Sequence, residues 1–410
     1  MPKILIIASG PLSLNPRPLK EAETLGRTGF DVTVLHVRNH AAAERQDQKL
    51  MLEAPFRRIA IDFLPKHATP AWRVLLRRVF SSASRRISTS LHLQSAQALG
   101  PAWLLLRRAR TVSADLTIVH NEAPHWVGVS LMTEGRRVAA DIEDWHSEDL
   151  LPQDRIGRPQ RLIRSVERQL LRNAAYTSTT SHSLADALHA RYGGIRPHVI
   201  TNSFPLQPDP HRGPPGSPPA FFWFSQTLGP GRGLELFLAA WAKTVEPSQV
   251  VFLGEPTAGY REKVLRRLPL THRHRIEFLE LVPPSLLASL IARHDIGLAL
   301  EQAFIVNRDL TITNKILQYL NAGLAVVASD TAGQREVLAR APGAGMIVSL
   351  FQTDELAGHL DGLLRDRPRI ATMGEAARRA AEETYCWEKE APNLLAAVRK
   401  ALEAPVSATR

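Results

Sequence analysis

The 410-residue sequence has a single cysteine, Cys386. One thiol excludes an intramolecular disulfide framework and a cysteine-rich metal site. Long apolar segments are also lacking, because no run of about 18 consecutive apolar residues occurs. Met1 leads directly into the apolar run KILIIA, with no charged leader and no cleavage site before it. We therefore expect a cytoplasmic protein that is soluble or peripheral at the inner face of a membrane.

Acidic residues are scarce in one part of the chain. Residues 57–110 contain eleven Lys and Arg residues but only one acid, Asp62. The formal charge of the whole chain is +11, and residues 1–205, with 28 basic and 18 acidic residues, carry +10 of it. An anionic partner of the N-terminal half is therefore expected: a membrane surface, a nucleic acid or an anionic substrate.

Within this basic region, residues 71–110 have an amphipathic helical pattern. Apolar side chains recur at helical spacing from Trp72 to Phe80, with arginines between them, and Gly100-Pro101 interrupts the pattern. The pattern allows two interpretations. One is a helix that faces the core and exposes its charged side, and the other is an interfacial helix on anionic lipid. Nucleic acid is not an expected partner, because no stacking aromatic residues interleave with the arginines.

The chain opens as a βαβ unit without a dinucleotide-binding fingerprint. A strand over residues 3–8, a helix over 19–27 and a strand over 31–37 are predicted, with Gly10 in the first turn. The motif G-x-G-x-x-G is absent, and His36 and Arg38 stand where an acid would bind a ribose. Binding of a nicotinamide or flavin dinucleotide is therefore not expected.

Residues 294–337 form a second βαβ pattern, with strands over 296–300 and 324–328 and a helix over 313–322. The start of this helix lies at the carboxyl edge of the predicted sheet, where open α/β folds bind ligands. Thr311 or Thr313 can cap the helix, which leaves the next amides free to bind an anion. Lys315 adds a positive charge there. Asn314 and Gln318 offer donors and acceptors that suit ribose or sugar hydroxyls.

The segment NKILQYLNAGLAVVASD, followed by GQREV, resembles the nucleotide-sugar half of the GT-B glycosyltransferases, particularly the retaining family-4 type. The resemblance covers nearly the whole chain. It implies an α/β protein with two Rossmann-like, doubly wound parallel-sheet domains facing one another across a cleft. In that family two glutamates eight residues apart hold the donor. Here they fall on Leu310 and Gln318, so Glu301 or Asp309 would have to replace the first glutamate.

The resemblance implies further donor contacts at a glycine-rich turn, QTLGPGRG, between a strand and a helix. Family members place an arginine and a lysine in this turn, and both grip the diphosphate. This chain has Gln226 and Arg232 at those positions. Gly233 in the same turn, Glu255 at the exit of the next strand, and Gly10 complete the candidate donor-binding residues.

In the N-terminal half, His120 matches the family's strand-end histidine, which lies beside the transferred sugar and the acceptor. Asn15 and Arg17, in the loop after the first strand, are candidates for acceptor or diphosphate contact, or are solvated. An acidic loop follows the strand RRVAADI, and its residues either bind a divalent cation by charge or are solvated. These residues are Asp141, Glu143, Asp144, His146 and Glu148. We expect no metal site, because metal-ligand spacing is not evident.

Four segments are predicted. They are an acceptor-side domain over residues 1–204, a proline-rich linker over 205–219, a nucleotide-sugar-binding domain over 220–385, and a closing helix over 386–410 that crosses back to the first domain.

The predicted activity is transfer of a sugar, with retention, from a UDP- or GDP-linked donor. The expected acceptor is a cell-envelope glycan or lipid-linked intermediate, as in polysaccharide biosynthesis, and no other cofactor is expected. Residues 71–110 would contact an anionic membrane surface. Two alternatives stay open: a GT-B nucleotide-sugar epimerase, and a non-catalytic nucleotide-sugar-binding protein.

Overall fold

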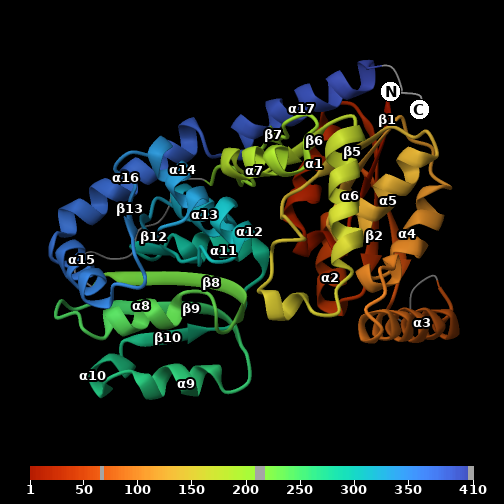
Figure 1. The fold of residues 1–410 in the computed structure, drawn as a ribbon. Helices are drawn as coiled ribbons and strands as arrows, with labels where there is room; N and C mark the ends of the chain where they lie inside the picture. The colour runs from red at the N-terminus through yellow and green to blue at the C-terminus, as the bar shows by residue number, and fades with distance from the viewer. Residues whose placement is uncertain (65–68, 208–217, 405–410) are drawn as a thin grey trace. The chain divides into compact units, whose positions relative to one another are not determined.

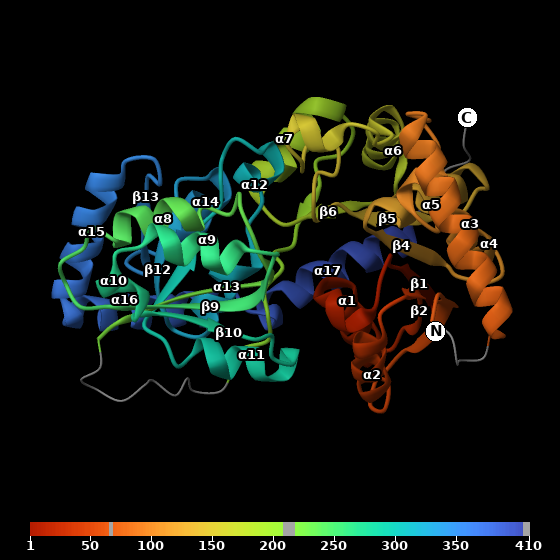
Figure 2. The ribbon, with the colours of Figure 1, turned by 90° about the horizontal axis from the view of Figure 1, so that it is seen from below.

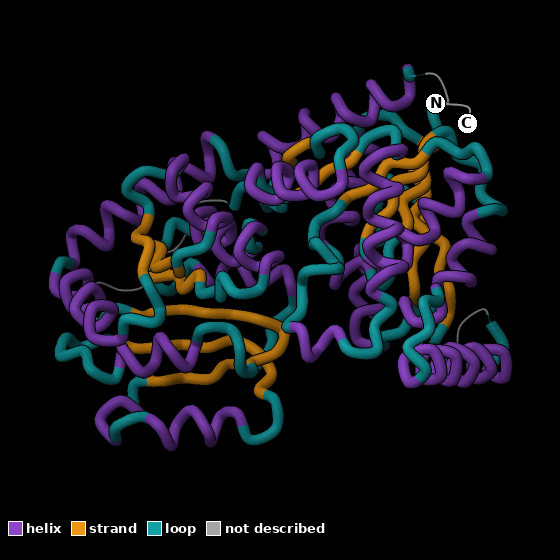
Figure 3. The backbone as a smooth tube through the Cα atoms, viewed as in Figure 1, coloured by secondary structure: helices purple, strands orange, loops and turns teal. Residues whose placement is uncertain are grey.

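The computed structural model describes residues 1–64, 69–207 and 218–404, which form two compact units. Of the described residues, unit 1 comprises residues 1–64, 69–180, 184–200 and 391–404, and unit 2 comprises residues 181–183, 201–207 and 218–390. In each unit the strands form one layer with helices on both sides of it (Figure 3). Most of the predicted linker, residues 208–217, lies outside the described residues.

Unit 1 is built on a parallel sheet that has seven strands in the described residues, in the order β3-β2-β1-β4-β5-β6-β7. The strands are β1 (Lys3–Ile7), β2 (Asp31–Arg38), β3 (Arg57–Asp62), β4 (Leu116–His120), β5 (Val138–Asp141), β6 (Thr177–Thr179) and β7 (His198–Val199). The helices are α1 (Pro16–Arg27), α2 (Ala41–Leu50), α3 (Ala71–Ser90), α4 (Ala102–Ala109), α5 (Glu122–Thr133), α6 (Gln160–Asn173) and α7 (His182–Tyr192). Short 3-10 turns cover Leu12–Leu14, Ala96–Leu99 and Pro152–Arg155.

Unit 2 repeats this plan, and its described strands run parallel in the order β10-β9-β8-β11-β12-β13. They are β8 (Ala220–Leu228), β9 (Gln249–Pro256), β10 (Ile276–Leu279), β11 (Ile296–Ala299), β12 (Ala325–Ser329) and β13 (Gly345–Val348). The helices are α8 (Leu234–Trp241), α9 (Tyr260–Arg267), α10 (Leu270–Arg273), α11 (Pro284–Ile291), α12 (Val306–Leu310), α13 (Asn314–Asn321), α14 (Ala332–Arg340), α15 (Thr353–Arg365), α16 (Arg367–Glu383) and α17 (Trp387–Glu403). Helix α17 begins in unit 2 and ends in unit 1.

The strand order explains why the sequences of the central strands are continuous apolar runs. In both sheets the first strand is an interior strand, and helical crossovers bury both faces of the sheet. Strands β4, β11 and β12 are buried at every position. Polar side chains that are available to bind a ligand therefore lie at the ends of the strands.

The start of one helix and the presence of another differ from the sequence prediction. Helix α1 begins at Pro16 rather than Leu19, because Asn15 takes the N-cap position and a proline is well suited to the first helical turn. The predicted loop before α13 contains the short helix α12. Arg17 consequently lies on the first turn of α1 and not in a loop.

Helix α3 overturns the interpretation of a core-facing amphipathic helix. Val74 and Ser88 are its buried residues, whereas Trp72, Leu76 and Phe80 are 59%, 59% and 66% exposed. Figures 1 and 2 show α3 on the outer side of unit 1. Its apolar face points to solvent. Among the helices of the described residues, none combines the length and the hydropathy needed to cross a bilayer.

Close packing of α13 on β11 depends on Gly297. A Cβ at this position would lie 2.2 Å from Cγ of Tyr319, which is fully buried and donates its hydroxyl to the carbonyl of Leu298 at 3.3 Å. The missing side chain lets the helix that carries Lys315 approach the strand that leads to Glu301.

We predict that Gly297→Ala lowers the free energy of unfolding by about 1–3 kcal/mol, because the added methyl group overpacks the contact with Tyr319. Chemical denaturation measures the change. The matched control is Gly358→Ala in α15, where nothing lies within 4 Å of the new Cβ. The control should be stabilised by about 0.5–1 kcal/mol, as for alanine over glycine in a helix. Equal stability of the two variants would contradict the packing argument.

Candidate functional site

The carboxyl edge of the unit 2 sheet brings together polar residues from two central strands. The strand order reverses between β8 and β11, which is the topological switch point where open α/β sheets bind ligands. Arg232 lies in the turn after β8, and Glu301 follows β11. Lys315 stands on the first turn of α13.

Glu301 joins the two cations of this edge. Its side chain is 2% exposed, and Oε1 accepts a hydrogen bond from Nζ of Lys315 at 3.0 Å. Nη1 of Arg232 lies 3.9 Å from Oε2 of Glu301, and this arginine is 38% exposed. The ammonium of Lys315 also lies 5.2 Å from the ring centroid of Trp223 on β8. One buried carboxylate thus holds a largely buried cation and a more exposed cation close together.

Ser329, at the end of β12, fixes the backbone of Glu301. Its Oγ accepts from the Glu301 amide at 2.8 Å and donates to the Glu301 carbonyl at 2.7 Å. Nε2 of Gln334 in turn donates to the Ser329 oxygen at 3.0 Å. The backbone amide of Gln334 donates to the side-chain oxygen of Thr331, the N-cap residue of α14, at 3.3 Å.

Three polar atoms of this region lack a hydrogen-bond partner within the described part of the chain. They are Oε2 of Glu301, Oε1 of Gln334 and Oγ1 of Thr313. Thr313 takes the N-cap position of α13, but its side chain makes no capping bond in the structure described. Buried polar atoms in native proteins are normally paired. These acceptors and the hydroxyl suit a ligand that brings its own hydroxyl groups.

The glycine-rich turn after β8 requires Gly233. Its φ is +78°, and a Cβ there would lie 2.8 Å from Cδ1 of Leu350 and 3.2 Å from Cβ of Leu300. Only glycine combines that backbone with that space. Arg308 donates to the carbonyl of Gly231 at 3.0 Å and ties the turn to α12.

The other donor-site candidates of unit 2 are placed differently. Asp309 accepts from the amide of Ala332 at 3.0 Å, so its carboxylate caps α14. Of the two acids predicted to replace the family glutamate, Glu301 is the one in contact with Lys315. Gln318 and Asn314 are half-buried on α13, and Glu255 is exposed at the end of β9.

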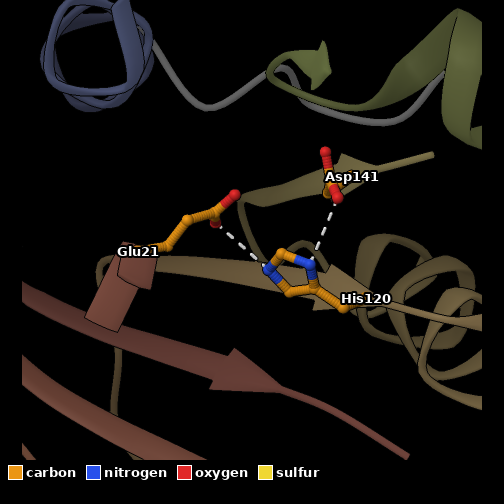
Figure 4. A group of neighbouring side chains, drawn as sticks. All are labelled: Glu21, His120 and Asp141. Carbon is orange, nitrogen blue, oxygen red and sulfur yellow. Dashed lines mark ion pairs between the residues drawn. The ribbon is translucent and has the colours of Figure 1, made fainter. Parts of the chain in front are cut away.

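Unit 1 carries a buried ionic cluster at the carboxyl ends of β4 and β5, shown in Figure 4. His120 is 1% exposed, with Nε2 at 3.1 Å from Glu21 and Nδ1 at 3.3 Å from Asp141. Arg17 donates two hydrogen bonds to Asp141, at 2.7 and 2.6 Å, and a third to the carbonyl of Ile200 at 2.6 Å. The side chains come from α1, β4 and β5.

The carboxylates keep His120 charged. Burial alone lowers the pKa of His120, but Glu21 and Asp141 outweigh it and raise the pKa to about 10. Burial alone raises the pKa of Asp141, but Arg17 and then His120 hold it well below its usual range. Two cations therefore face two carboxylates in a site closed to water.

The cluster is also the one group of three acidic or histidine side chains in the described residues whose geometry would admit a metal ion, with its atoms within 4.8 Å of one another. The guanidinium of Arg17 already occupies both oxygens of Asp141, and a metal would require His120 without its proton. The arrangement fits a charged hydrogen-bonded network better than a cation site.

The remaining acidic-loop residues are not uniformly solvated. Burial and then Asp144 raise the pKa of Glu143 to about 7. Glu148 pairs with Arg155 at 2.7 Å and with Arg164 at 3.2 Å. Gly10 lies in the loop after β1, beside the side chain of Asn15, which donates to the carbonyl of Pro11 at 2.7 Å.

Comparison with known proteins establishes the fold and finds a family match in the second half of the chain. Residues 219–366 match the sequence profile of the family Glycosyl transferases group 1. Sucrose-phosphate synthase from Thermosynechococcus elongatus shares the fold over 99% of this chain and 100% of its own, with a TM-score of 0.71 at 14% identity. Anabaena HepE in complex with UDP-glucose matches 97% of this chain and 100% of its own, with a TM-score of 0.67 at 16% identity.

The chain has the GT-B fold, and its residues 219–366 resemble the glycosyl transferases group 1 family. The predicted GT-B fold is confirmed, and the predicted resemblance to the glycosyltransferases is confirmed over residues 219–366. A curated relative, spore coat protein SA of Bacillus subtilis (strain 168), is 23% identical over 185 residues. That alignment covers 43% of this chain and 48% of the relative, so the chain spans about half the length of the relative.

In this GT-B protein, sequence reasoning missed the partners of the predicted residues. Glu21 reads as an ordinary helix residue, and its approach to His120 depends on how α1 packs on β4. Ser329 reads as the last residue of an apolar strand, although it fixes Glu301. The sequence predicts that Arg17 is solvated or contacts a ligand, whereas the structure buries it completely.

We predict that His120→Gln lowers the free energy of unfolding by about 3–5 kcal/mol at neutral pH, because two buried carboxylates lose a cationic partner. The pKa of His120 rises from 6.5 to about 10 on folding. Its stabilisation is therefore complete below the unfolded pKa and is lost as pH rises through the folded pKa. Denaturation curves between neutral pH and about pH 10 should show a decline in the wild type that is absent from the variant.

The control is His189→Gln on the exposed side of α7, which should follow the wild-type pH profile. A His120→Gln profile parallel to that of the wild type would show that the histidine is uncharged in the folded protein.

Proposed function

We propose that the protein transfers a sugar from a UDP- or GDP-linked donor to an acceptor, with retention of configuration. The observation that carries this proposal is the juxtaposition of Arg232, Glu301 and Lys315 at the carboxyl edge of the unit 2 sheet. All three residues lie within the segment that matches the glycosyl transferases group 1 family. Anabaena HepE, which shares the fold, forms a complex with UDP-glucose, and this supports a nucleotide sugar as the donor class.

These residues bind the diphosphate that leaves when the sugar is transferred. Its negative charge grows as the sugar departs, and preorganised cations and amides stabilise such a charge strongly in a water-poor site. Arg232 and Lys315 supply the cations. The amides of residues 314–316 begin α13 and lack intrahelical partners, so they add donors at the positive end of the helix dipole.

Glu301 balances these cations in the absence of a donor. When a diphosphate takes over the contacts with Arg232, Oε2 of Glu301 becomes an acceptor for a hydroxyl of the transferred sugar. Gln318, one turn into α13, serves the ribose with its amide, and Asn314 lies one turn before it.

In the transfer itself, the bond between the anomeric carbon and the phosphate oxygen breaks, and a bond to the acceptor oxygen forms on the same face of the sugar. The acceptor proton passes to the departing diphosphate. The residues of this chain stabilise charge and orient the partners. His120 contributes as a positioning residue, because its contact with Asp141 holds the ends of β4 and β5 together. The next residue, Asn121, is fixed by a hydrogen bond that its Oδ1 accepts from the backbone amide of Ser9 at 3.2 Å.

The proposed acceptor is a cell-envelope glycan or lipid-linked intermediate, within polysaccharide biosynthesis at the cytoplasmic side of the membrane. The excess of basic residues in residues 1–205 supports an anionic acceptor or surface. An epimerase would convert the donor without an acceptor, and a binding protein would leave it unchanged, so product analysis distinguishes the three.

We predict that Arg232→Ala weakens UDP binding by about 1.5–3 kcal/mol, the range for a hydrogen bond to a charged group. Isothermal calorimetry on folded protein measures the change, with UDP and GDP compared in parallel. Arg266→Ala, an exposed arginine of α9 in the same unit, is the matched control and should keep wild-type affinity. Unchanged UDP affinity in Arg232→Ala would remove this arginine from the diphosphate site.

We further predict that Glu301→Gln retains or tightens UDP binding, because it removes a negative charge from between two cations, and that it slows turnover of the sugar donor about tenfold or more. Turnover is followed as release of nucleoside diphosphate with and without an acceptor mixture, and NMR of the product reports the anomeric configuration. Weaker UDP binding together with unchanged turnover would assign Glu301 a structural role alone.

A further inference from the structure

Helix α3 is the feature of unit 1 that sugar transfer does not use. Its inward side is a stripe of small and polar residues at heptad spacing, from Val74 through Ser81 to Ser88. Val74 and Ser88 are 1% and 2% exposed. The inward side therefore buries little apolar surface, in contrast to the usual helix of a globular protein.

The opposite side of α3 is apolar and exposed. Seven large side chains on α3 and its C-cap are between 55% and 66% exposed: Trp72, Leu75, Leu76, Val79, Phe80, Ile87 and Leu91. Most of them recur at helical spacing, so they form a stripe along the helix. An exposed apolar patch of this kind marks an interaction surface.

Specific contacts hold α3 in this orientation. Arg77 and Arg78 donate to the carbonyls of Asp62 and Phe63, at 3.3 and 2.5 Å, and so tie α3 to the end of β3. At the other end, Gly157 approaches so closely that a Cβ would lie 2.7 Å from Cγ2 of Thr89. The apolar stripe is thus presented outward by a helix that is fixed to unit 1.

The positive charge around the apolar stripe of α3 indicates the chemical class of its partner. Residues 69–114 contain eight arginines and no acid. Arg73, Arg85 and Arg86 are exposed on α3, and the guanidinium of Arg73 lies 5.1 Å from the centroid of the Trp72 ring. A second copy docked through the same face would oppose arginines to arginines, because a two-fold contact pairs a surface with itself. An anionic surface with an apolar interior satisfies both the charges and the stripe.

We propose that α3 docks unit 1 on an anionic lipid bilayer, with its apolar stripe in the acyl boundary and its arginines among the headgroups. Helices with one apolar and one cationic side lie in the plane of the interface in this manner. The helix keeps its contacts with β3 and lies on the membrane without crossing it. This docking is independent of the proposed sugar transfer, although a lipid-linked acceptor would be brought to the enzyme by it.

The test is co-sedimentation of the full chain with vesicles of phosphatidylcholine, with and without one-third phosphatidylglycerol. Binding should require phosphatidylglycerol and weaken as salt rises, since screening acts on exposed charges. Replacing Arg73, Arg85 and Arg86 by Gln should weaken binding roughly 100-fold, at about fivefold per arginine. Replacing Leu75, Leu76 and Phe80 by Ser should weaken it about tenfold or more through the lost apolar insertion.

The matched control replaces Arg266, Arg293 and Arg369, three exposed arginines of unit 2, by Gln. It makes the same change in net charge and should keep wild-type binding. Because the substituted side chains are exposed, thermal unfolding should be unchanged in all three variants. Quenching of tryptophan fluorescence by brominated lipid should fall in Trp72→Phe, which places the stripe at acyl depth.

Several outcomes would overturn the proposal. If the protein pelleted equally with neutral and anionic vesicles, or pelleted with neither, an anionic bilayer would not be its partner. An equal loss of binding in the unit 2 control would reduce the effect to net charge. A wild-type dimer that the serine variant converts to a monomer in sedimentation velocity would assign the stripe to a second copy. Loss of UDP binding with retained vesicle binding would contradict the proposed function alone.

Discussion

Burial of both faces of each parallel sheet decides where this protein can carry charge. A central strand such as β11 or β12 has no solvent-facing side, so an ionisable group along it would be unpaired in the core. At the carboxyl ends of the strands, charged side chains from neighbouring elements pair with such a group. His120, Asp141 and Glu301 all stand at or directly after such ends. The polar chemistry of both units thus follows from the same topological rule.

The two clusters offset the free-energy cost of burying charged side chains in different ways. In unit 1, Arg17 and His120 face Glu21 and Asp141, and the balanced charges hold α1 against β4 and β5. In unit 2, Glu301 meets a largely buried lysine at 3.0 Å and a half-exposed arginine at 3.9 Å, and one of its oxygens lacks a hydrogen bond in the described residues. In the first cluster the atoms of Glu21 and His120 also lack hydrogen bonds in the described residues, but each lies within 3.6 Å of an oppositely charged, fully buried partner. The second has room for another anion or hydroxyl, which fits a ligand site.

Much of this organisation could be predicted from the sequence. Continuous apolar runs bounded by glycine and polar residues predicted the parallel sheets, and the segment from Asn314 to Asp330 indicated the GT-B fold. Long-range pairing could not be predicted. Neither the contact of Glu21 with His120, 99 positions apart in the numbering, nor the clamp of Ser329 on Glu301 leaves a local pattern. Both depend on how crossovers bring distant residues to one sheet edge.

Helix α3 shows a further limit of periodicity. Apolar residues at helical spacing reveal that a helix has two sides, but not which side packs on the protein. Here the small residues at Ser81 and Ser88 allow close approach, and hydrogen bonds from Arg77 and Arg78 to backbone carbonyls fix the helix. A helix can therefore be attached through polar and small groups while its apolar side stays outside. The missing acids between residues 69 and 114 were the sequence signal for this arrangement, because a solvated helix face normally mixes both signs of charge.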